Sequence, residues 1–187
     1  MASLIAACVV RALRPDAGTV GITAIDKRPV IGAVKVGRLG LYADVQTDRK
    51  HHGGADKAVY AYAQEDADFW SAELGRDLPP GWFGENLRVS GLDVSNARVG
   101  ERWRIGSPGS PASFVELVVT MPRSPCATFA RWVGGADQRG WVKRFGAEGR
   151  LGAYLRVIRT GAVCAGDEIK LLAVPADAPT ILEVYRA

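Results

Sequence analysis

The apolar segments of this chain are short, and each one ends at a glycine, a proline or a polar turn. Glycine (22) and proline (10) supply 32 of the 187 residues, which favours many turns and a β-rich fold over a helical bundle. The irregular spacing of the segments favours a closed or nearly closed β-barrel over a sandwich of regular hairpins. The predicted strands are Ala6–Leu13, Val30–Val36, Ala58–Tyr62, Glu101–Ile105, Phe114–Met121, Ala153–Ile158 and Glu168–Val174.

Three helices are predicted between these strands. Gln64–Leu74 has apolar residues at three- and four-residue steps and a glycine directly after it, so it is expected to be amphipathic. Trp141–Phe145 is expected to form a short helix. Ser124 is a good N-cap residue and Pro125 suits the first helical position, so a further helix should begin there and continue through Ala127–Val133.

The length of 187 residues corresponds to about one domain. We expect a single barrel domain over residues 1–175, followed by a short C-terminal tail over residues 176–187. No apolar run approaches the ~18 residues that span a bilayer, so no membrane association is expected. The first ten residues are apolar, but no basic residue precedes them and Arg11 interrupts them. This pattern favours a buried first strand over a secretory signal, and a cytoplasmic location.

Basic residues are concentrated in one part of the chain. The net charge of +4 is too small to indicate nucleic acid as a partner, but residues 123–159 hold eight basic and two acidic side chains. Such a block could form a solvated face, bind nucleic acid or hold a small anionic ligand. Of these partners, we expect the small molecule.

The three cysteines are Cys8, Cys126 and Cys164, and their spacing matches neither a disulfide framework nor a Cys-x-x-Cys metal site. Cys126 falls in the first turn of a predicted helix, where backbone N–H groups and the helix dipole stabilise a thiolate, and Arg123 is close in sequence. Cys126 could therefore be a nucleophile or a soft metal ligand. The alternative is a small buried apolar side chain, which is the usual role of a thiol outside a disulfide.

Two loops could accompany this cysteine. Residues 48–57 hold both histidines, and the successive glycines Gly53 and Gly54 could form an anion-binding nest beside Lys57. His51 and His52 are adjacent, so on an extended chain they would point to opposite sides. The alternative is a glycine turn with solvated charges.

The second loop, residues 79–87, has two glycines around aromatic residues, and Glu85 and Asn86 offer polar groups at its exit. Turn formation alone would also explain it. The chain has no P-loop, Gly-x-Gly-x-x-Gly, Gly-x-Ser-x-Gly or His-Glu-x-x-His motif, which argues against ordinary nucleotide, dinucleotide, serine-hydrolase and zincin sites.

In their order along the chain, these segments resemble the MOSC domain, the C-terminal domain of molybdenum cofactor sulfurases. The resemblance is closest to the stand-alone bacterial branch (YiiM-like) linked to N-hydroxylaminopurine resistance, and it covers roughly residues 23–172. The matching landmarks are Lys27–Val30, His52–Tyr60, Phe83–Leu87, Val99–Arg102, Pro122–Cys126, Gly149–Val157 and Ala165–Ile169. Ala43-Asp44 stands where the family commonly has Gly-Asp, and Ala127-Thr128 stands where aromatic residues often follow the cysteine.

The resemblance implies a closed β-barrel of the pyruvate-kinase-barrel-like type with a few peripheral helices. It also implies that the chain binds a molybdenum cofactor (molybdopterin), with Cys126 as the metal ligand. Members of this branch are similar to two-electron reductases of N-hydroxylated bases that receive electrons from external redox proteins. The implied site residues are Cys126 and His52 as catalytic groups, with Gly53, Gly54, Lys57, Glu85, Asn86 and Arg123 binding the cofactor.

Other functions remain open at this stage. One is a cofactor or sulfur carrier that performs no turnover. Another is a thiol-dependent hydrolase or transferase that pairs Cys126 with His52 and either Asp44 or Asn86. Pyridoxal phosphate is associated with the family through a separate domain of the founding sulfurases, and Lys57 could form a Schiff base only in principle.

Overall fold

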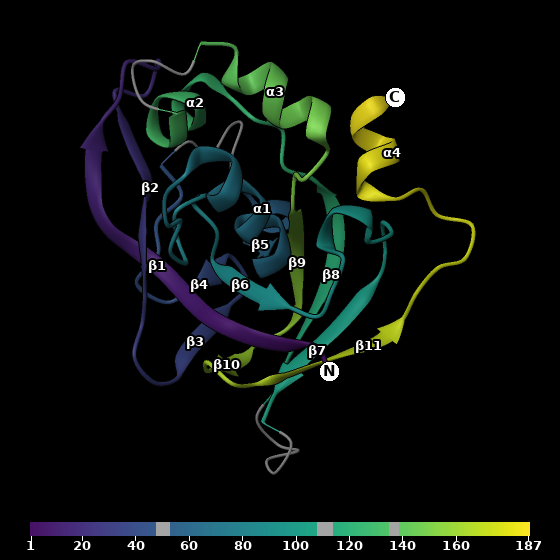
Figure 1. The fold of residues 1–187 in the computed structure, drawn as a ribbon. Coiled ribbons are helices and arrows are strands. Elements are labelled where there is room, and N and C mark those ends of the chain that lie inside the picture. The colour runs from purple at the N-terminus through teal and green to yellow at the C-terminus, as the bar shows by residue number, and fades with distance from the viewer. Residues whose placement is uncertain (48–52, 108–113, 135–138) are drawn as a thin grey trace.

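Seven strands of the chain close into a β-barrel (Figure 1). The computed structural model describes residues 1–47, 53–107, 114–134 and 139–187. Around the barrel the order is β11-β7-β8-β9-β5-β6-β1, and a β1–β11 pairing completes the circle. The predicted closed barrel is therefore confirmed. Its strands are β1 (Ser3–Pro15), β5 (Val59–Ala63), β6 (Leu87–Ser90), β7 (Arg102–Gly106), β8 (Phe114–Pro122), β9 (Ala153–Arg159) and β11 (Glu168–Ala173).

Closure of the barrel depends on the first strand. Ser3 at the start of β1 is the Cα partner of both Ser90 in β6 and Glu168 in β11, so one residue joins the two ends of the sheet. The pairings around the barrel are antiparallel except for β5–β6, which is parallel. A parallel pair requires a crossover connection, and α1 (Gln64–Leu74) lies within it.

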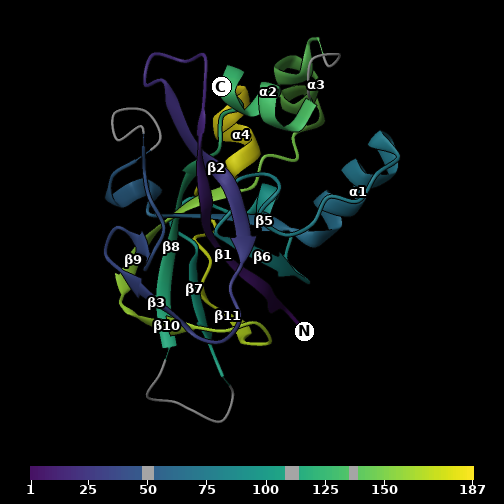
Figure 2. The same ribbon diagram turned by 90° about the vertical axis from the view of Figure 1, so that its left-hand side faces the viewer.

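The outer half of β1 leaves the barrel and pairs with β2 (Ile22–Pro29), forming a two-stranded hairpin that rises toward α2 (Figure 2). The sequence analysis did not predict β2, because the charged run Asp26-Lys27-Arg28 interrupts its apolar pattern. In the structure the buried Asp26 accepts hydrogen bonds from Arg14, and Lys27 pairs with Asp44. The charges of this strand are thus satisfied by partners that sequence periodicity does not reveal.

A second, small sheet lies beside the barrel and contains β3 (Val34–Gly37), β4 (Gly40–Leu41) and β10 (Gly161–Val163). β4, β6 and β10 were not predicted, since strands of two to four residues give little periodic signal. The predicted strand Val30–Val36 was wrong at its start, because regular structure begins only at Val34. Two short 3-10 helices, η1 (Ala55–Lys57) and η2 (Val94–Asn96), complete the connections.

Helices cover one end of the barrel (Figure 1). The predicted bounds of α1 are confirmed, whereas α2 (Ala127–Gly134) and α3 (Trp141–Glu148) extend beyond their predicted ends. α1, α2 and α3 pack through an aromatic cluster in which neighbouring rings contact one another. The largest fully buried members of this cluster are Trp70, Trp141, Tyr62, Phe83, Phe129 and Phe145.

Residues 176–187, predicted as a tail, contain helix α4 (Ile181–Arg186). Thr180 and Glu183 form a capping box at its start, which fixes the first turn. Ile181 is fully buried in the main barrel core, so this segment packs against the domain. The division at residue 175 stays a prediction.

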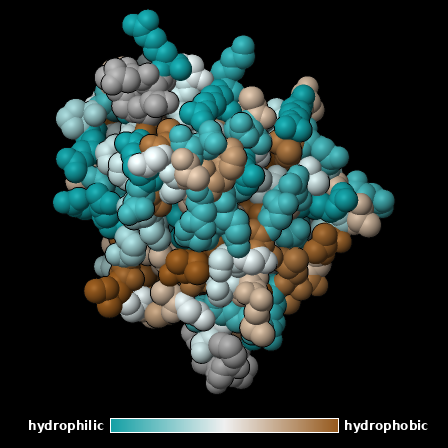
Figure 3. Space-filling model, viewed as in Figure 1, coloured by the Kyte–Doolittle hydropathy of each residue, from teal (hydrophilic) through white to brown (hydrophobic). Residues whose placement is uncertain are grey.

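The barrel interior is a packed apolar core, which includes Trp103, Leu117 and Leu155 at 0–1% exposure. On the outside, hydrophilic side chains dominate the face shown in Figure 3, and apolar side chains gather near its lower edge. Within the residues that the structure describes, no helix has the length and apolar character needed to cross a bilayer.

Ala43 has a backbone conformation that alanine rarely adopts. Its φ of 67° places it in the left-handed region. The left-handed conformation costs an L-residue roughly 1–2 kcal/mol. The adjacent Asp44 therefore receives its backbone direction from a strained turn.

We predict that Ala43→Gly stabilises the protein by up to about 1 kcal/mol. Relief of the strain outweighs the roughly 0.5–1 kcal/mol of unfolded-state entropy that glycine adds. Urea denaturation and thermal unfolding measure the change, with a rise in Tm of roughly 2–4 °C per kcal/mol. Ala72→Gly, at an exposed position in α1, is the matched control and should destabilise instead. Destabilisation by both variants would contradict the assigned strain.

Candidate functional site

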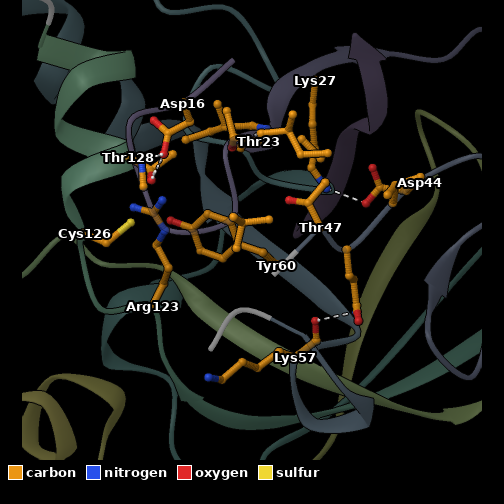
Figure 4. Close-up of a pocket in the computed structure, with 18 of the residues that line it drawn as sticks. Asp16, Thr23, Lys27, Asp44, Thr47, Lys57, Tyr60, Arg123, Cys126 and Thr128 are labelled. Atoms are coloured by element: carbon orange, nitrogen blue, oxygen red, sulfur yellow. Dashed lines mark hydrogen bonds and ion pairs between the residues drawn. The ribbon is translucent and has the colours of Figure 1, made fainter. Parts of the chain in front are cut away.

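A cavity of about 460 Å³ lies between the β1–β2 hairpin, the start of α2 and the barrel strands β5 and β9 (Figure 4). Four cationic side chains and two carboxylates line it, so its formal net charge is +2. The cavity volume lies within the range of about 300–1,000 Å³ that is typical of small-molecule sites. The charged and polar groups around it include Asp16, Lys27, Asp44, Lys57, Asn86, Arg123, Cys126 and Arg131.

Cys126 lines this cavity at the start of α2. The amide of Ala130 donates to the Cys126 carbonyl at 2.9 Å, which makes Cys126 the N-cap residue and Ala127 the first residue of the helix. The prediction that Ser124 is the N-cap was therefore wrong by two residues. The prediction of a cysteine at a helix start is confirmed. The thiol is half-buried and belongs to no disulfide.

Arg123 is 6% exposed, and its guanidinium lies beside Cys126 in the cavity (Figure 4). Its guanidinium carbon is 3.7 Å from the ring centroid of Phe129 and 5.4 Å from that of Tyr60, so aromatic rings hold it in place. The buried Nη1 atom has no hydrogen-bond partner among the described residues. A buried cationic donor without a partner is costly, and an anionic ligand would satisfy it.

Two tyrosines form an uncharged wall next to this arginine. Burial raises the pKa of Tyr60 well above its usual value, and its hydroxyl donates to the Leu151 carbonyl at 2.8 Å. Burial likewise raises the pKa of Tyr154, although the neighbouring Arg123 opposes the increase. Both rings therefore remain neutral at physiological pH, and the positive charge of Arg123 is not cancelled by a phenolate.

Asp44 is the acceptor for three donors at the inner end of the cavity. The Val10 amide donates to Oδ1 at 2.9 Å, while Lys27 Nζ and Asn86 Nδ2 donate to Oδ2 at 2.5 Å and 2.7 Å. The Asn86 side-chain oxygen accepts from the Tyr60 amide at 3.1 Å. Asn86 therefore lines the cavity, and its amide also joins β5 to the Asp44 turn.

Glu85, predicted to bind the cofactor, points elsewhere. Its carboxylate is fully buried, forms an ion pair with Arg88 and accepts from the amides of Gly81 and Phe83 at 2.8 Å and 2.9 Å. It is not among the residues that line the cavity. Its observed contacts stabilise the loop of residues 79–87, and this loop positions the adjacent Asn86 in the cavity lining.

The glycine-rich segment is only partly described. Lys57 lines the cavity, whereas Gly53 and Gly54 are not among its lining residues. Gln46 connects this segment to the site, since its side chain accepts from the Gly54 amide at 2.9 Å and donates to the Lys57 carbonyl at 3.3 Å. His52 lies outside the described residues, so its predicted catalytic role stays a prediction.

Several groups at the site were missed by the sequence analysis. Asp16 binds Arg131 through two nitrogens and also accepts from Thr128 Oγ1 at 2.8 Å. Asp16 and Arg131 are 115 positions apart, and no local motif connects them. The Asp16–Gly18 turn was the available signal, because an aspartate that binds the amide two residues later commonly shapes a hairpin turn.

The basic block of residues 123–159 does not form one surface. Arg123 is buried in the cavity, and Arg131, Arg144, Arg150 and Arg156 each pair with a carboxylate. The carboxylate partners of these four arginines lie on the hairpin turn, η1 and α1, and are Asp16, Asp56, Asp66 and Glu73. Most of the excess charge is thus used in separate structural contacts.

The other two cysteines lie outside the cavity lining. Burial raises the pKa of the Cys8 thiol to about 12, so it stays protonated under physiological conditions. Cys164 is half-buried in the turn before β11. Among the described residues, no group of three or more His, Cys, Asp or Glu side chains could hold a metal ion.

Comparison with known proteins gives the family. The sequence model of the MOSC domain matches residues 48–170. The uncharacterized protein YflK of Bacillus subtilis (strain 168) is 36% identical over 150 residues, which are 80% of this chain and 63% of YflK. Protein YiiM of Escherichia coli (strain K12) is 31% identical over 144 residues, which are 70% of this chain and 61% of YiiM.

A protein named reductase from Gibberella moniliformis (strain M3125 / FGSC 7600) is 31% identical over 190 residues, covering 95% of this chain but 31% of that protein. The chain thus spans less than two thirds of the length of each of these three relatives. The crystal structure of YiiM from Geobacillus stearothermophilus superposes with a TM-score of 0.76 at 26% identity, covering 100% of this chain and 83% of that one. On its sequence and its barrel, the chain belongs to the MOSC domain family.

Proposed function

We propose that this chain binds the molybdenum cofactor with Cys126 as a ligand to the metal, and that it reduces N-hydroxylated or N-oxygenated compounds. One observation carries the proposal: a helix-start thiol and a buried arginine with an unpartnered Nη1 atom lie side by side in one cavity. Membership of the MOSC family supports the cofactor, and a relative named reductase supports the reaction type.

The residues present fit such a group. A thiolate is a soft ligand suited to a metal of this class, and the N-cap position of Cys126 favours its ionised form. The Arg123 Nη1 donor has no partner among the residues that the structure describes, and Lys57 adds a second cation to the lining, so an anionic group would be held by both. The excess positive charge of the cavity suits the anionic tail of a pterin cofactor.

The proposed reaction cleaves the N–O bond of the substrate. Two electrons and two protons convert an N-hydroxyl compound into the corresponding amine and one molecule of water. The bound cofactor supplies the two-electron centre, and an external electron-transfer protein supplies the electrons. Cys126 holds the metal, Arg123 and Lys57 hold the anionic part of the cofactor, and Tyr60 and Tyr154 exclude water from one side. Three cysteines outside disulfides suit a reducing compartment such as the cytoplasm.

Cys126→Ser should lose most of the bound molybdenum while the fold is retained, because a hydroxyl is a harder and less acidic ligand than a thiol. Elemental and pterin analysis of protein from a molybdenum-replete host measures the loss, and circular dichroism checks the fold. Cys164→Ser is the matched control and should keep parental metal content, since Cys164 lies outside the cavity lining. Equal molybdenum in Cys126→Ser and the parent would refute the ligand role.

The same preparations separate the alternatives. A carrier would contain molybdenum but would not reduce an N-hydroxylated base with an artificial electron donor. A thiol-dependent hydrolase or transferase would contain no molybdenum and would react at Cys126 with substrate-like electrophiles. Turnover that depends on both molybdenum and Cys126 is the outcome expected here.

Arg123→Met should lower cofactor content about tenfold or more, since a charge-assisted hydrogen bond contributes roughly 1.5–3 kcal/mol. The same variant should leave the unfolding temperature of the cofactor-free protein unchanged or higher, because it removes a buried donor with no partner in the described part of the chain. Pterin analysis and thermal unfolding measure the two effects. Arg159→Met, which removes an arginine stacked on Phe114 outside the cavity lining, is the control for charge and stacking. Full cofactor content in a destabilised Arg123→Met would show that Arg123 is structural.

A further inference from the structure

The character of the cavity wall changes along the β1–β2 hairpin. Lys27, at the inner end of β2, pairs with Asp44, whereas Ile22 begins the strand at its outer end and Val20 lies in the turn before it. All three of the hairpin residues Val20, Ile22 and Lys27 line the cavity. Lys27 follows Ile22 by five residue steps of extended strand, a distance of about 16 Å. The inner end of this wall thus carries the Lys27–Asp44 ion pair, whereas the outer end adds two branched apolar side chains, Val20 and Ile22, near Asp16.

The outer end of the hairpin lies next to the thiol. The Asp16 carboxylate accepts from Arg131 Nε at 3.0 Å and from Thr128 Oγ1 at 2.8 Å, and both partners belong to α2. These contacts hold the outer end of the hairpin against the first turn of the helix that Cys126 caps. Figure 4 shows Asp16, Thr128 and Cys126 at one end of the cavity, with Lys27 and Asp44 at the other.

Val20 and Ile22 remain 44% and 45% exposed although they line the cavity. A single exposed apolar side chain is ordinary on a protein surface. Here two branched side chains border the same cavity, beside the cysteine proposed as the metal ligand. A ligand with an apolar part would remove both from water.

We propose that the outer end of the hairpin selects the substrate: Val20 and Ile22 contact an uncharged, apolar ring of an N-hydroxylated compound whose N–O group faces the Cys126 end of the cavity. Asp16 is a positioning residue, because its ion pair with Arg131 fixes the outer end of the hairpin. Val20 and Ile22 at this outer end form the rim of the cavity. The inference rests on the proposed function, since it takes the Cys126 end as the reacting end. A small polar N-hydroxyl compound has no apolar ring, so it would gain little from contact with Val20 and Ile22.

Ile22→Asn and Val20→Asn test this selection with two substrates, an aromatic N-hydroxylated base and the small polar N-hydroxyurea. For the aromatic base, kcat/KM should fall about tenfold, mainly through KM, because lost apolar contact of this size changes discrimination roughly 10–200-fold. For N-hydroxyurea, kcat/KM should stay within about twofold. Leu13→Asn, at a 50% exposed position of β1 outside the lining, is the matched control and should change neither value.

A binding measurement keeps the test independent of turnover. Calorimetric titration of cofactor-loaded protein with the reduced aromatic base should give a Kd about tenfold higher in both rim variants than in the parent and in Leu13→Asn. Asp16→Asn should raise KM for the aromatic base at unchanged kcat, which a general loss of structure would not produce.

The outcomes distinguish the two proposals. If the parent protein reduced neither substrate, the proposed function would be overturned. The calorimetric comparison would then test only whether Val20 and Ile22 contact the bound aromatic base. Turnover with an unchanged preference in the rim variants, an equal loss for both substrates or an equal loss in Leu13→Asn would overturn the selection by Val20 and Ile22. An unchanged Kd in the rim variants, or no binding by the parent, would also overturn it.

Discussion

The hydrogen bonds and ion pair of the Asp44 carboxylate fix the inner end of the cavity. The carboxylate joins the backbone of β1 at Val10, the Lys27 ammonium of β2 and the Asn86 amide before β6. Burying a charge of either sign is costly unless partners surround it. Here the Asp44 carboxylate accepts from the Lys27 ammonium, the Asn86 side chain and the Val10 amide, so the buried charges are paired. The position of the hairpin relative to the barrel, and with it the cavity, depends on this arrangement.

The loop that carries Asn86 depends on a second buried pair. Glu85 and Arg88 are both fully buried, and the Arg88 guanidinium also reaches the carbonyls of Leu78 and Pro79. Glu85 and Asn86 are neighbours in sequence, yet Glu85 accepts hydrogen bonds from the loop backbone and Asn86 lines the cavity. Composition marks both as candidate site residues, but only the direction of each side chain separates the two roles.

Local sequence patterns predicted the strands and helices whose formation depends on residues close together in the chain. Alternating apolar residues gave most of the barrel strands, helical periodicity gave α1, and the Ser-Pro-Cys segment placed Cys126 at a helix start within two residues. The missed features depend on distant partners. In β2, Asp26 pairs with Arg14 and Lys27 pairs with Asp44, and the contact of Asp16 with Arg131 spans 115 positions. No single segment contains the information that fixes such pairs, because the whole barrel must form before the partners meet.

Two energetic costs converge on the same cavity. Ala43 holds a left-handed conformation immediately before Asp44, and Arg123 buries a donor that has no partner among the described residues. Strained backbone and unsatisfied buried groups persist where the surrounding structure enforces them, and they concentrate at functional sites. The strained turn directs the Asp44 carboxylate at the inner end of the cavity. The Arg123 guanidinium, whose Nη1 atom has no hydrogen-bond partner among the described residues, lies beside the thiol. Because a bound anion would satisfy Arg123, the protein is expected to reach its full stability only with its ligand in place.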